Sequence, residues 1–263
     1  MLVPTRTRVP FLAALLACLA ACSTPRVDVM PRLTMAKLDG TIAANTSGGA
    51  LTSNDLSKDL GLGETEDEFG ARADMVVGGS TFTFAWSPAS FSGSGTLSSD
   101  ITNGGTTITA GTAVTTDADL NVGSAIWTHD FVPGENLELG LGLGVQVLDY
   151  HSTMRSAGGT IDMDQTAPIP VLAARAGAAF GPFDVSALVS GLTGTFDGND
   201  ATFLDADLMG RWRFFGGVAG ELSGSLVLGW KYTDTKLDYT DSGDRTKVDA
   251  NVSGLYYGLS IGF

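Results

Sequence analysis

The feature that most constrains the fold is an unbroken two-residue alternation from Leu137 to Val147. One set of positions holds Leu137, Leu139, Leu141, Leu143, Val145 and Val147, and the other holds Glu138, Gly140, Gly142, Gly144 and Gln146. Successive side chains of a β-strand point to opposite faces, so this stretch predicts a strand with one strongly apolar face. A soluble β-sandwich turns such a face inward, whereas a membrane barrel turns it toward lipid. Alternation alone fits both architectures.

The same period recurs in 203–215 and in the segment after Gly217. The first of these places Asp205, Asp207, Arg211 and Arg213 on one face, and the second does the same with Glu221, Ser223, Ser225 and Lys231. Charged groups gathered on one face need either solvent or a polar lumen that pairs them. After residue 21 no apolar run reaches the roughly 18 residues of a membrane helix, so only a closed barrel could span a membrane.

The N-terminus has the form of an export signal. Arg6 and Arg8 precede an apolar run, Val9–Ala21, which is too short for a membrane helix. The run ends in Leu-Ala-Ala-Cys22, which resembles the lipobox of bacterial lipoproteins and implies acylation of Cys22. We therefore predict a signal peptide over 1–21, a lipidated tether over 22–32 and a barrel over 33–263. The mature chain then has no cysteine pair, and its formal charge changes from −14 to −16 because two arginines are removed.

Turn positions favour the barrel over the sandwich. Tight turns are expected at Gly78-Gly79, Pro133-Gly134-Glu135, Gly181-Pro182 and Gly216-Gly217, and longer polar links near 93–114, 153–160, 195–201 and 239–246. Alternating short and long connections are typical of outer-membrane barrels, whose short turns are periplasmic. Aromatic residues cluster beside the short turns, as expected for a girdle at one membrane interface: Phe131, Phe180, Phe183, Phe214, Phe215 and Phe263.

The positions of the turns also set the number of strands. Nine segments alternate clearly: 69–78, 80–91, 115–131, 136–152, 161–180, 183–194, 202–215, 217–238 and 247–263. If the short turns lie on one side, an even barrel needs one more strand at the start, and 33–44 is the candidate. The sequence thus predicts an all-β, closed antiparallel up-and-down transmembrane barrel of about ten strands, with eight as the alternative.

The last strand alternates up to the C-terminal aromatic, with Tyr257, Leu259, Ile261 and Phe263 on one face. This pattern resembles the C-terminal assembly signal of bacterial outer-membrane barrels. More broadly, 33–263 resembles the small, largely uncharacterised outer-membrane barrels of Gram-negative bacteria. The resemblance implies the fold, the outer membrane as location, and its lipids and the barrel-assembly machinery as partners. A lipobox on such a barrel is a departure from the usual pattern.

Charged residues on the polar faces are the main candidate site. We expect a lumen network of ion pairs that fills the barrel, formed by Arg72, Asp74, Glu138, Arg175, Asp184, Asp205, Asp207, Arg211, Arg213, Glu221 and Lys231. Its alternative is a charged constriction that selects solutes. The acidic charge argues against nucleic acid as a partner, while acidic loops offer possible contacts for divalent cations.

Catalysis has little support in the sequence. His129 and His151 are the two histidines, and a triad drawn with Ser152 places sequence neighbours on opposite faces of a strand. Aspartates near the predicted outer strand ends match no known calcium loop. We expect no cofactor and no enzyme activity, and a structural or surface-interaction role in the outer membrane. The alternatives are a narrow channel for small solutes and, third, a lipid-modifying hydrolase.

Overall fold

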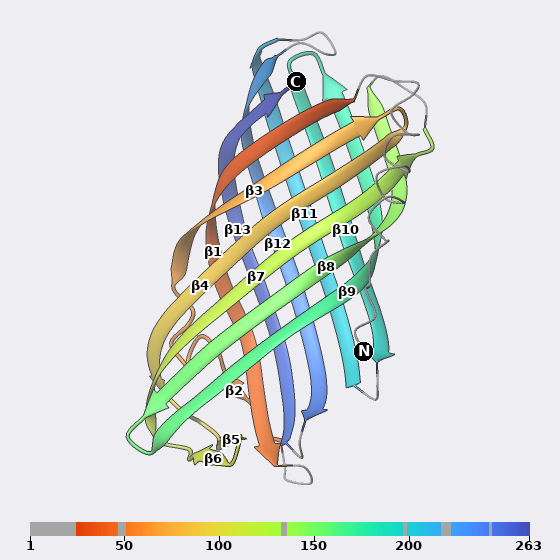
Figure 1. Ribbon diagram of the computed structural model, residues 1–263. Coiled ribbons are helices and arrows are strands. Elements are labelled where there is room, and N and C mark those ends of the chain that lie inside the picture. The colour runs from red at the N-terminus through yellow and green to blue at the C-terminus, as the bar shows by residue number, and fades with distance from the viewer. Residues whose placement is uncertain (1–24, 47–50, 133–135, 197–198, 217–221, 242–243) are drawn as a thin grey trace, which may run out of the picture.

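The computed structural model describes residues 25–46, 51–132, 136–196, 199–216, 222–241 and 244–263. Ten long strands form a closed antiparallel ring (Figure 1). They are β1 (Arg26–Thr46), β3 (Thr65–Val77), β4 (Ser80–Thr96), β7 (Ala113–Asp130), β8 (Leu137–Ser156), β9 (Gly159–Phe180), β10 (Phe183–Phe196), β11 (Asn199–Phe215), β12 (Ser223–Asp241) and β13 (Asp244–Gly262). β13 pairs with β1 from Gly262↔Asp28 onward, which closes the ring. The predicted ten-stranded up-and-down barrel is confirmed.

The two ends of the barrel differ. The tight turns at 78–79 and 181–182 lie at one end together with Phe263, and we call this the terminal end. Gly78 and Gly181 have positive φ values of 58° and 62°, the conformation that a side chain disfavours and glycine adopts freely. The opposite end, called the loop end, carries three short strands: β2 (Asn54–Asp55), β5 (Ile101–Asn103) and β6 (Thr106–Ile108). Among the described residues no helix is long and apolar enough to cross a membrane.

Several predicted boundaries are wrong because the strands extend further than expected. The links predicted at 153–160, 195–201 and 239–246 are mostly strand, since β8 continues to Ser156 and β9 starts at Gly159. Their polar residues belong to strands instead of loops, with some exposed on the outside, such as Arg155, and some inside, such as Thr246. β1 begins at Arg26, so residues 26–32 belong to the barrel and not to the tether predicted over 22–32. Residues 1–24, with the predicted signal peptide, lie outside the described part of the chain.

In the half of the barrel nearest the terminal end, the terminal half, apolar side chains face outward. Leu143 on β8 and Leu228 on β12 are 57% and 65% exposed, as lipid-facing residues are in a barrel without its membrane. The six phenylalanines predicted as a girdle are all exposed: Phe131, Phe180, Phe183, Phe214, Phe215 and Phe263. The lumen of this half is polar, with Arg32, Arg72 and Asp207 buried inside.

In the other half, the loop half, this arrangement is reversed. On β8 the outward apolar row ends at Val147, and Asp149 and His151 follow it, while Leu148 and Met154 are buried inside. One buried apolar cluster fills the lumen there with side chains from β1, β4, β7, β8 and β9: Ala36, Leu38, Ile42, Ala44, Ala89, Phe91, Val114, Ala118, Met154, Ile161 and Met163. The predicted polar lumen is therefore wrong for this half, which is built like a water-soluble barrel.

The wall of the loop half is divided by two seams. The ladder between β3 and β4 ends at Ala71↔Trp86, and the ladder between β9 and β10 ends at Leu172↔Gly191. β4, β7, β8 and β9 remain paired with one another to their loop ends, so they separate from the other six strands as a group. Figure 1 shows this as a divergence, with β7–β9 crossing to one side and β10–β12 running down the other.

Candidate functional site

The centre of the terminal half is a buried charge network. Asp207 on β11 accepts hydrogen bonds from Arg32 Nη1 at 2.8 Å and from Arg72 Nη1 at 3.3 Å. The hydroxyl of Tyr256 donates to its other carboxylate oxygen at 2.5 Å, and the Arg32 guanidinium lies 4.9 Å from the Tyr256 ring centroid. Arg72 also pairs with Asp74 at 3.1 Å. Two cations and two anions thus share one position in the lumen, and each is nearly inaccessible to solvent.

Three further ion pairs extend the network along the lumen. Arg211 Nε lies 2.5 Å from Asp184 Oδ1, and Arg175 Nη2 lies 3.2 Å from Glu138 Oε2. Nearer the loop half, Lys231 Nζ lies 3.1 Å from Asp205 Oδ2, which also accepts a hydrogen bond from the Thr233 hydroxyl. The structure therefore brings nine of the eleven predicted network residues into ion pairs. Arg213 forms no ion pair with a described residue, and Glu221 lies outside the described residues.

The sequence prediction omits three residues of the network: Arg32, Tyr256 and Asp28, whose Oδ2 lies 3.9 Å from Arg211 Nη1. Arg32 and Asp28 were missed because 22–32 was assigned to the tether, although they face the lumen from β1. Tyr256 lies between the lipid-facing Leu255 and Tyr257, and strand alternation alone would have placed it inside. The signal for Arg32 was present too: it lies six residues before Leu38 on the same face of one strand.

The histidines lie on the outer surface, away from the lumen. His151 Nδ1 is 4.0 Å from Asp164 Oδ2, with both side chains more than half exposed, and Asp119 faces the same row from β7. Ser152 points into the barrel and is buried, so it does not meet His151. His129 accepts or donates a hydrogen bond at 3.2 Å with Ser80 beside a terminal turn. No cluster of His, Cys, Asp and Glu suited to a metal ion occurs in the described part of the chain.

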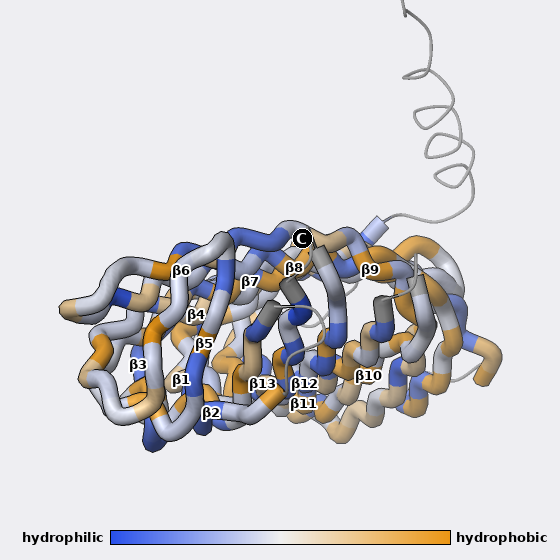
Figure 2. The backbone as a smooth tube through the Cα atoms, turned by 90° about the horizontal axis from the view of Figure 1, so that it is seen from below, coloured by the Kyte–Doolittle hydropathy of each residue, from blue (hydrophilic) through white to orange (hydrophobic). Residues whose placement is uncertain are grey.

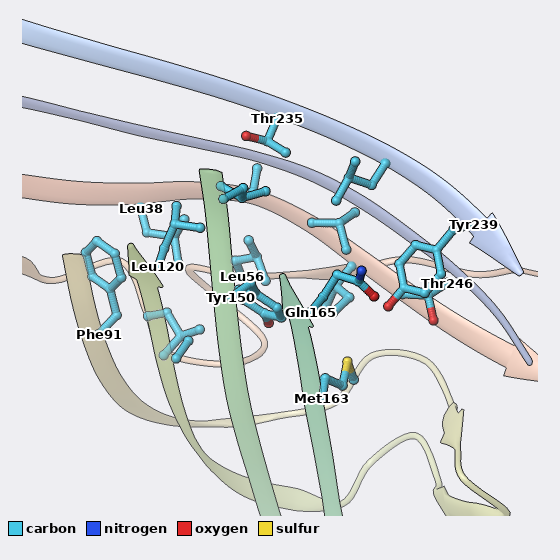
Figure 3. A pocket seen from close by; sticks show the side chains of 17 residues that line it. Leu38, Leu56, Phe91, Leu120, Tyr150, Met163, Gln165, Thr235, Tyr239 and Thr246 are labelled. Carbon is cyan, nitrogen blue, oxygen red and sulfur yellow. The ribbon is translucent and has the colours of Figure 1, made fainter. Parts of the chain in front are cut away.

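The loop half holds a cavity of about 50 Å³ (Figure 3). It is lined mainly by aliphatic and aromatic side chains, among them Leu38, Leu56, Phe91, Leu120, Met163 and Leu237. The described lining includes no charged residue. An apolar cavity can hold a small apolar molecule, and this one is several times the roughly 10–15 Å³ that one water requires.

A few polar groups lie in this apolar lining. Figure 3 shows Gln165, Tyr239 and Thr246 on one side of the cavity, with Phe91, Leu38 and Leu120 on the other. Thr235 also lines it, and its buried hydroxyl has no hydrogen-bond partner among the described residues. An unsatisfied buried hydroxyl is costly, so it favours a ligand with one hydrogen-bonding group.

Comparisons with known proteins agree on the architecture. No family model and no curated protein matches the sequence. Among solved structures, the outer membrane protease OmpT from Escherichia coli matches with a TM-score of 0.57 at 12% identity, over 93% of this chain and 100% of that one. This chain has the fold of an outer-membrane β-barrel.

Two further solved structures match with lower TM-scores. AlkL matches with a TM-score of 0.40 at 13% identity, covering 100% of this chain and 96% of that one. A FadL homologue of Pseudomonas aeruginosa matches with a TM-score of 0.37 at 10% identity, covering 94% and 92%. With TM-scores below 0.5, these two matches support no conclusion about this chain.

Proposed function

We propose that this chain is an integral outer-membrane protein that is closed to ions and binds a small, uncharged, mainly apolar molecule in its loop half. The observation that carries the proposal is the uncharged apolar cavity inside the loop half of the barrel. In this orientation the terminal end is periplasmic and the loop end is outside, as the short turns indicate. The role is non-enzymatic.

The charge network supports closure to ions. Arg32, Arg72, Asp74 and Asp207 meet across the lumen, and their side chains are at most 5% exposed. A hydrated ion would have to displace paired groups that hold one another in place. The narrow-channel alternative is therefore restricted to solutes that do not need a water-filled path.

The chemistry of the cavity defines its ligand class. Because its described lining carries no cation or anion, a charged ligand would lose its hydration without gaining an ion pair. An uncharged ring or short chain gains from burial against Leu56, Phe91 and Met163, and one hydroxyl or carbonyl group can meet Thr235 or Gln165.

Ligand binding can be tested on the full barrel in lipid nanodiscs by ¹⁹F NMR. We expect bound signals for fluorobenzene and 4-fluorophenol and none for 4-fluorobenzoate, because the last carries a charge. Ala250→Phe, which places a ring in the cavity, should abolish both signals. Ala187→Phe, on the outward face of β10, is the matched control and should leave them unchanged. Equal binding of all three compounds, or full binding by Ala250→Phe, would refute the proposal.

Closure to ions has a separate test in planar bilayers. The wild-type barrel should give no conductance steps in potassium chloride, because the network occupies the lumen. Arg211→Ala removes only the flanking pairs with Asp184 and Asp28 and should also remain silent. Stable conductance steps from the wild type would favour the charged-constriction alternative, particularly if Arg211→Ala changed their size.

The N-terminal lipid and the assembly signal belong to the same proposal. Cys22 lies outside the described residues, but β1 begins at Arg26, so an acyl chain on Cys22 would sit close to the terminal end of the barrel. Tyr257, Leu259 and Ile261 face outward on β13 and are about half exposed, as lipid contact requires. We infer that the lipid anchors in the periplasmic leaflet and that the barrel-assembly machinery recognises β13.

A further inference from the structure

We propose that the apolar ligand exchanges between the cavity and the outer leaflet of the membrane sideways, through the seam between β9 and β10. This inference rests on the proposed function and adds the route and the immediate source of the ligand. The membrane, and not the external water, would then deliver the molecule.

The barrel is obstructed along its axis in both directions. Toward the terminal end, the network around Asp207 fills the lumen. Toward the loop end, the β5–β6 hairpin contacts β1 and β9 and buries Ile101 and Ile108 in the apolar cluster. Figure 2, which looks onto the loop end, shows β5 and β6 in front of the long strands. The two seams are the remaining breaks in the described wall.

The seam between β3 and β4 is filled. β2 pairs with β1 there, and Leu56, Leu60 and Leu62 from the following turn are buried in the apolar cluster. The side chain of Asn54 accepts hydrogen bonds from the backbone N–H groups of Ser98 and Ser99, both at 2.9 Å. This seam is therefore closed by an inserted segment that is bonded to the chain beyond β4.

In the described part of the chain, no inserted segment fills the seam between β9 and β10. The edge of β9 that faces β10 also lacks backbone donors with which to extend the ladder. Ala179 N–H donates to Asn136 O on the β8 side, so the even-numbered residues of β9 direct their backbone groups toward β10. Pro168 and Pro170 are even-numbered and lie just beyond the last ladder pair, Leu172↔Gly191. Proline has no N–H, so this edge carries no unsatisfied donors at these positions and cannot extend the ladder.

Apolar side chains link the cavity to the start of this seam. Leu148 and Leu237 line the cavity, and they pack in one cluster with Ile169, Leu188 and Phe203 on the inner side. On the outer side Leu172 is 66% exposed. Gly191, opposite Leu172, adds no side chain there. Farther along β9 toward the loop end, Gln165 lines the cavity and is also exposed to solvent, so the cavity is open on this side.

The position of the seam fits delivery from the outer leaflet. Leu172 and Val189 are the outward apolar residues nearest its start, and Thr166 and Thr193 continue the two strands with polar side chains. The seam thus opens at the edge of the lipid-facing surface, where an apolar molecule dissolved in the membrane would meet the barrel.

The test measures exchange and affinity separately, using ¹⁹F exchange NMR of fluorobenzene with the full barrel in nanodiscs. Ala167→Trp places an indole on the inward face of β9 between Gln165 and Ile169, within the route. We expect at least a tenfold slower exchange with a dissociation constant within threefold of the wild type. Phe203→Ala widens the start of the seam and should accelerate exchange several-fold. Ala187→Trp, facing lipid on the paired part of β10, is the control and should change neither quantity.

A second arm identifies the source of the ligand. Nanodiscs of two lipids with different partition coefficients for fluorobenzene are compared at one aqueous concentration. The association rate should follow the concentration in the lipid, and a rate that follows only the aqueous concentration overturns the lateral route.

Failure of the route and failure of the binding site give different results. Absence of a bound signal in the wild type contradicts the proposed function itself. Normal binding with unchanged exchange in Ala167→Trp, or in Phe203→Ala should Ala167→Trp not fold, contradicts only the lateral route. Folding of each variant is established beforehand by heat-modifiable gel migration.

Discussion

Replacing Asp207 by asparagine tests the charge network most directly. The substitution keeps the shape of the side chain but leaves Arg32 without its carboxylate partner and Arg72 with Asp74 alone. Two charge-assisted hydrogen bonds at about 1.5–3 kcal/mol each suggest a loss of about 3–6 kcal/mol, and breaking a buried ion pair from one side costs about 3–5 kcal/mol. We therefore expect the free energy of unfolding to fall by about 4 kcal/mol.

The measurement is urea unfolding in lipid vesicles, followed by tryptophan fluorescence. Asp117→Asn is the matched control, because Asp117 pairs with Arg155 on the exposed outer face, where a pair contributes at most about 1 kcal/mol. Adding Arg32→Met to Asp207→Asn should recover part of the loss, since it removes the uncompensated cation. A loss below about 1 kcal/mol for Asp207→Asn would show that water reaches the network, and the argument for a closed lumen would fail with it.

Further predictions concern the inserted segment and the N-terminus. Asn54→Ala should speed hydrogen exchange of the Ser98 and Ser99 amides at least tenfold by mass spectrometry, because it removes their acceptor; unchanged exchange would mean the segment is held otherwise. The backbone N–H of Lys58 lowers the pKa of Asp55 below its ordinary value, so Asp55 stabilises its turn fully above about pH 4 and progressively less as the pH falls below it. In the wild type, proteolysis within 55–62 should be faster below this pH than above it. In Asp55→Asn, the rate of proteolysis should be the same on both sides of this pH. An inhibitor of lipoprotein signal peptidase should cause the precursor to accumulate, and Cys22→Ser should prevent lipid labelling while the heat-modifiable band persists. Correct processing under the inhibitor would assign cleavage to an ordinary signal.

The strand number could be predicted because it depends on local signals. The strands show a two-residue alternation of apolar and polar positions in the sequence, and glycines indicate the turns at Gly78 and Gly181. The even count followed from placing those turns on one side, and the structure has ten strands in the ring. Strand ends were less predictable, because the polar residues around Ser156 read equally well as a loop or as the outer face of a sheet.

The character of the lumen could not be predicted from alternation, since a period of two does not say which face is inside. Leu148 and Tyr150 alternate with Asp149 and His151 in the same way as Gln146 alternates with Val147. In the first case the apolar residues face inward, and in the second they face outward. Only the closure of the ring, which brings Leu38 of β1 and Met163 of β9 into one cluster, reveals the apolar lumen of the loop half and its cavity.

The reversal between the two halves also determines how deeply the barrel sits in its membrane. Each residue advances a strand by about 3.3 Å, so sinking the barrel by two residues would move Asp149 on β8 to the level now held by Val147. Raising it by the same amount would move the uppermost lipid-facing residues, such as Val147 on β8 and Leu172 on β9, from lipid into water, at a cost in apolar contact. The boundary between apolar and polar outward residues therefore fixes the depth of the barrel in the membrane. The seam between β9 and β10 is held at a constant height relative to the surrounding lipid.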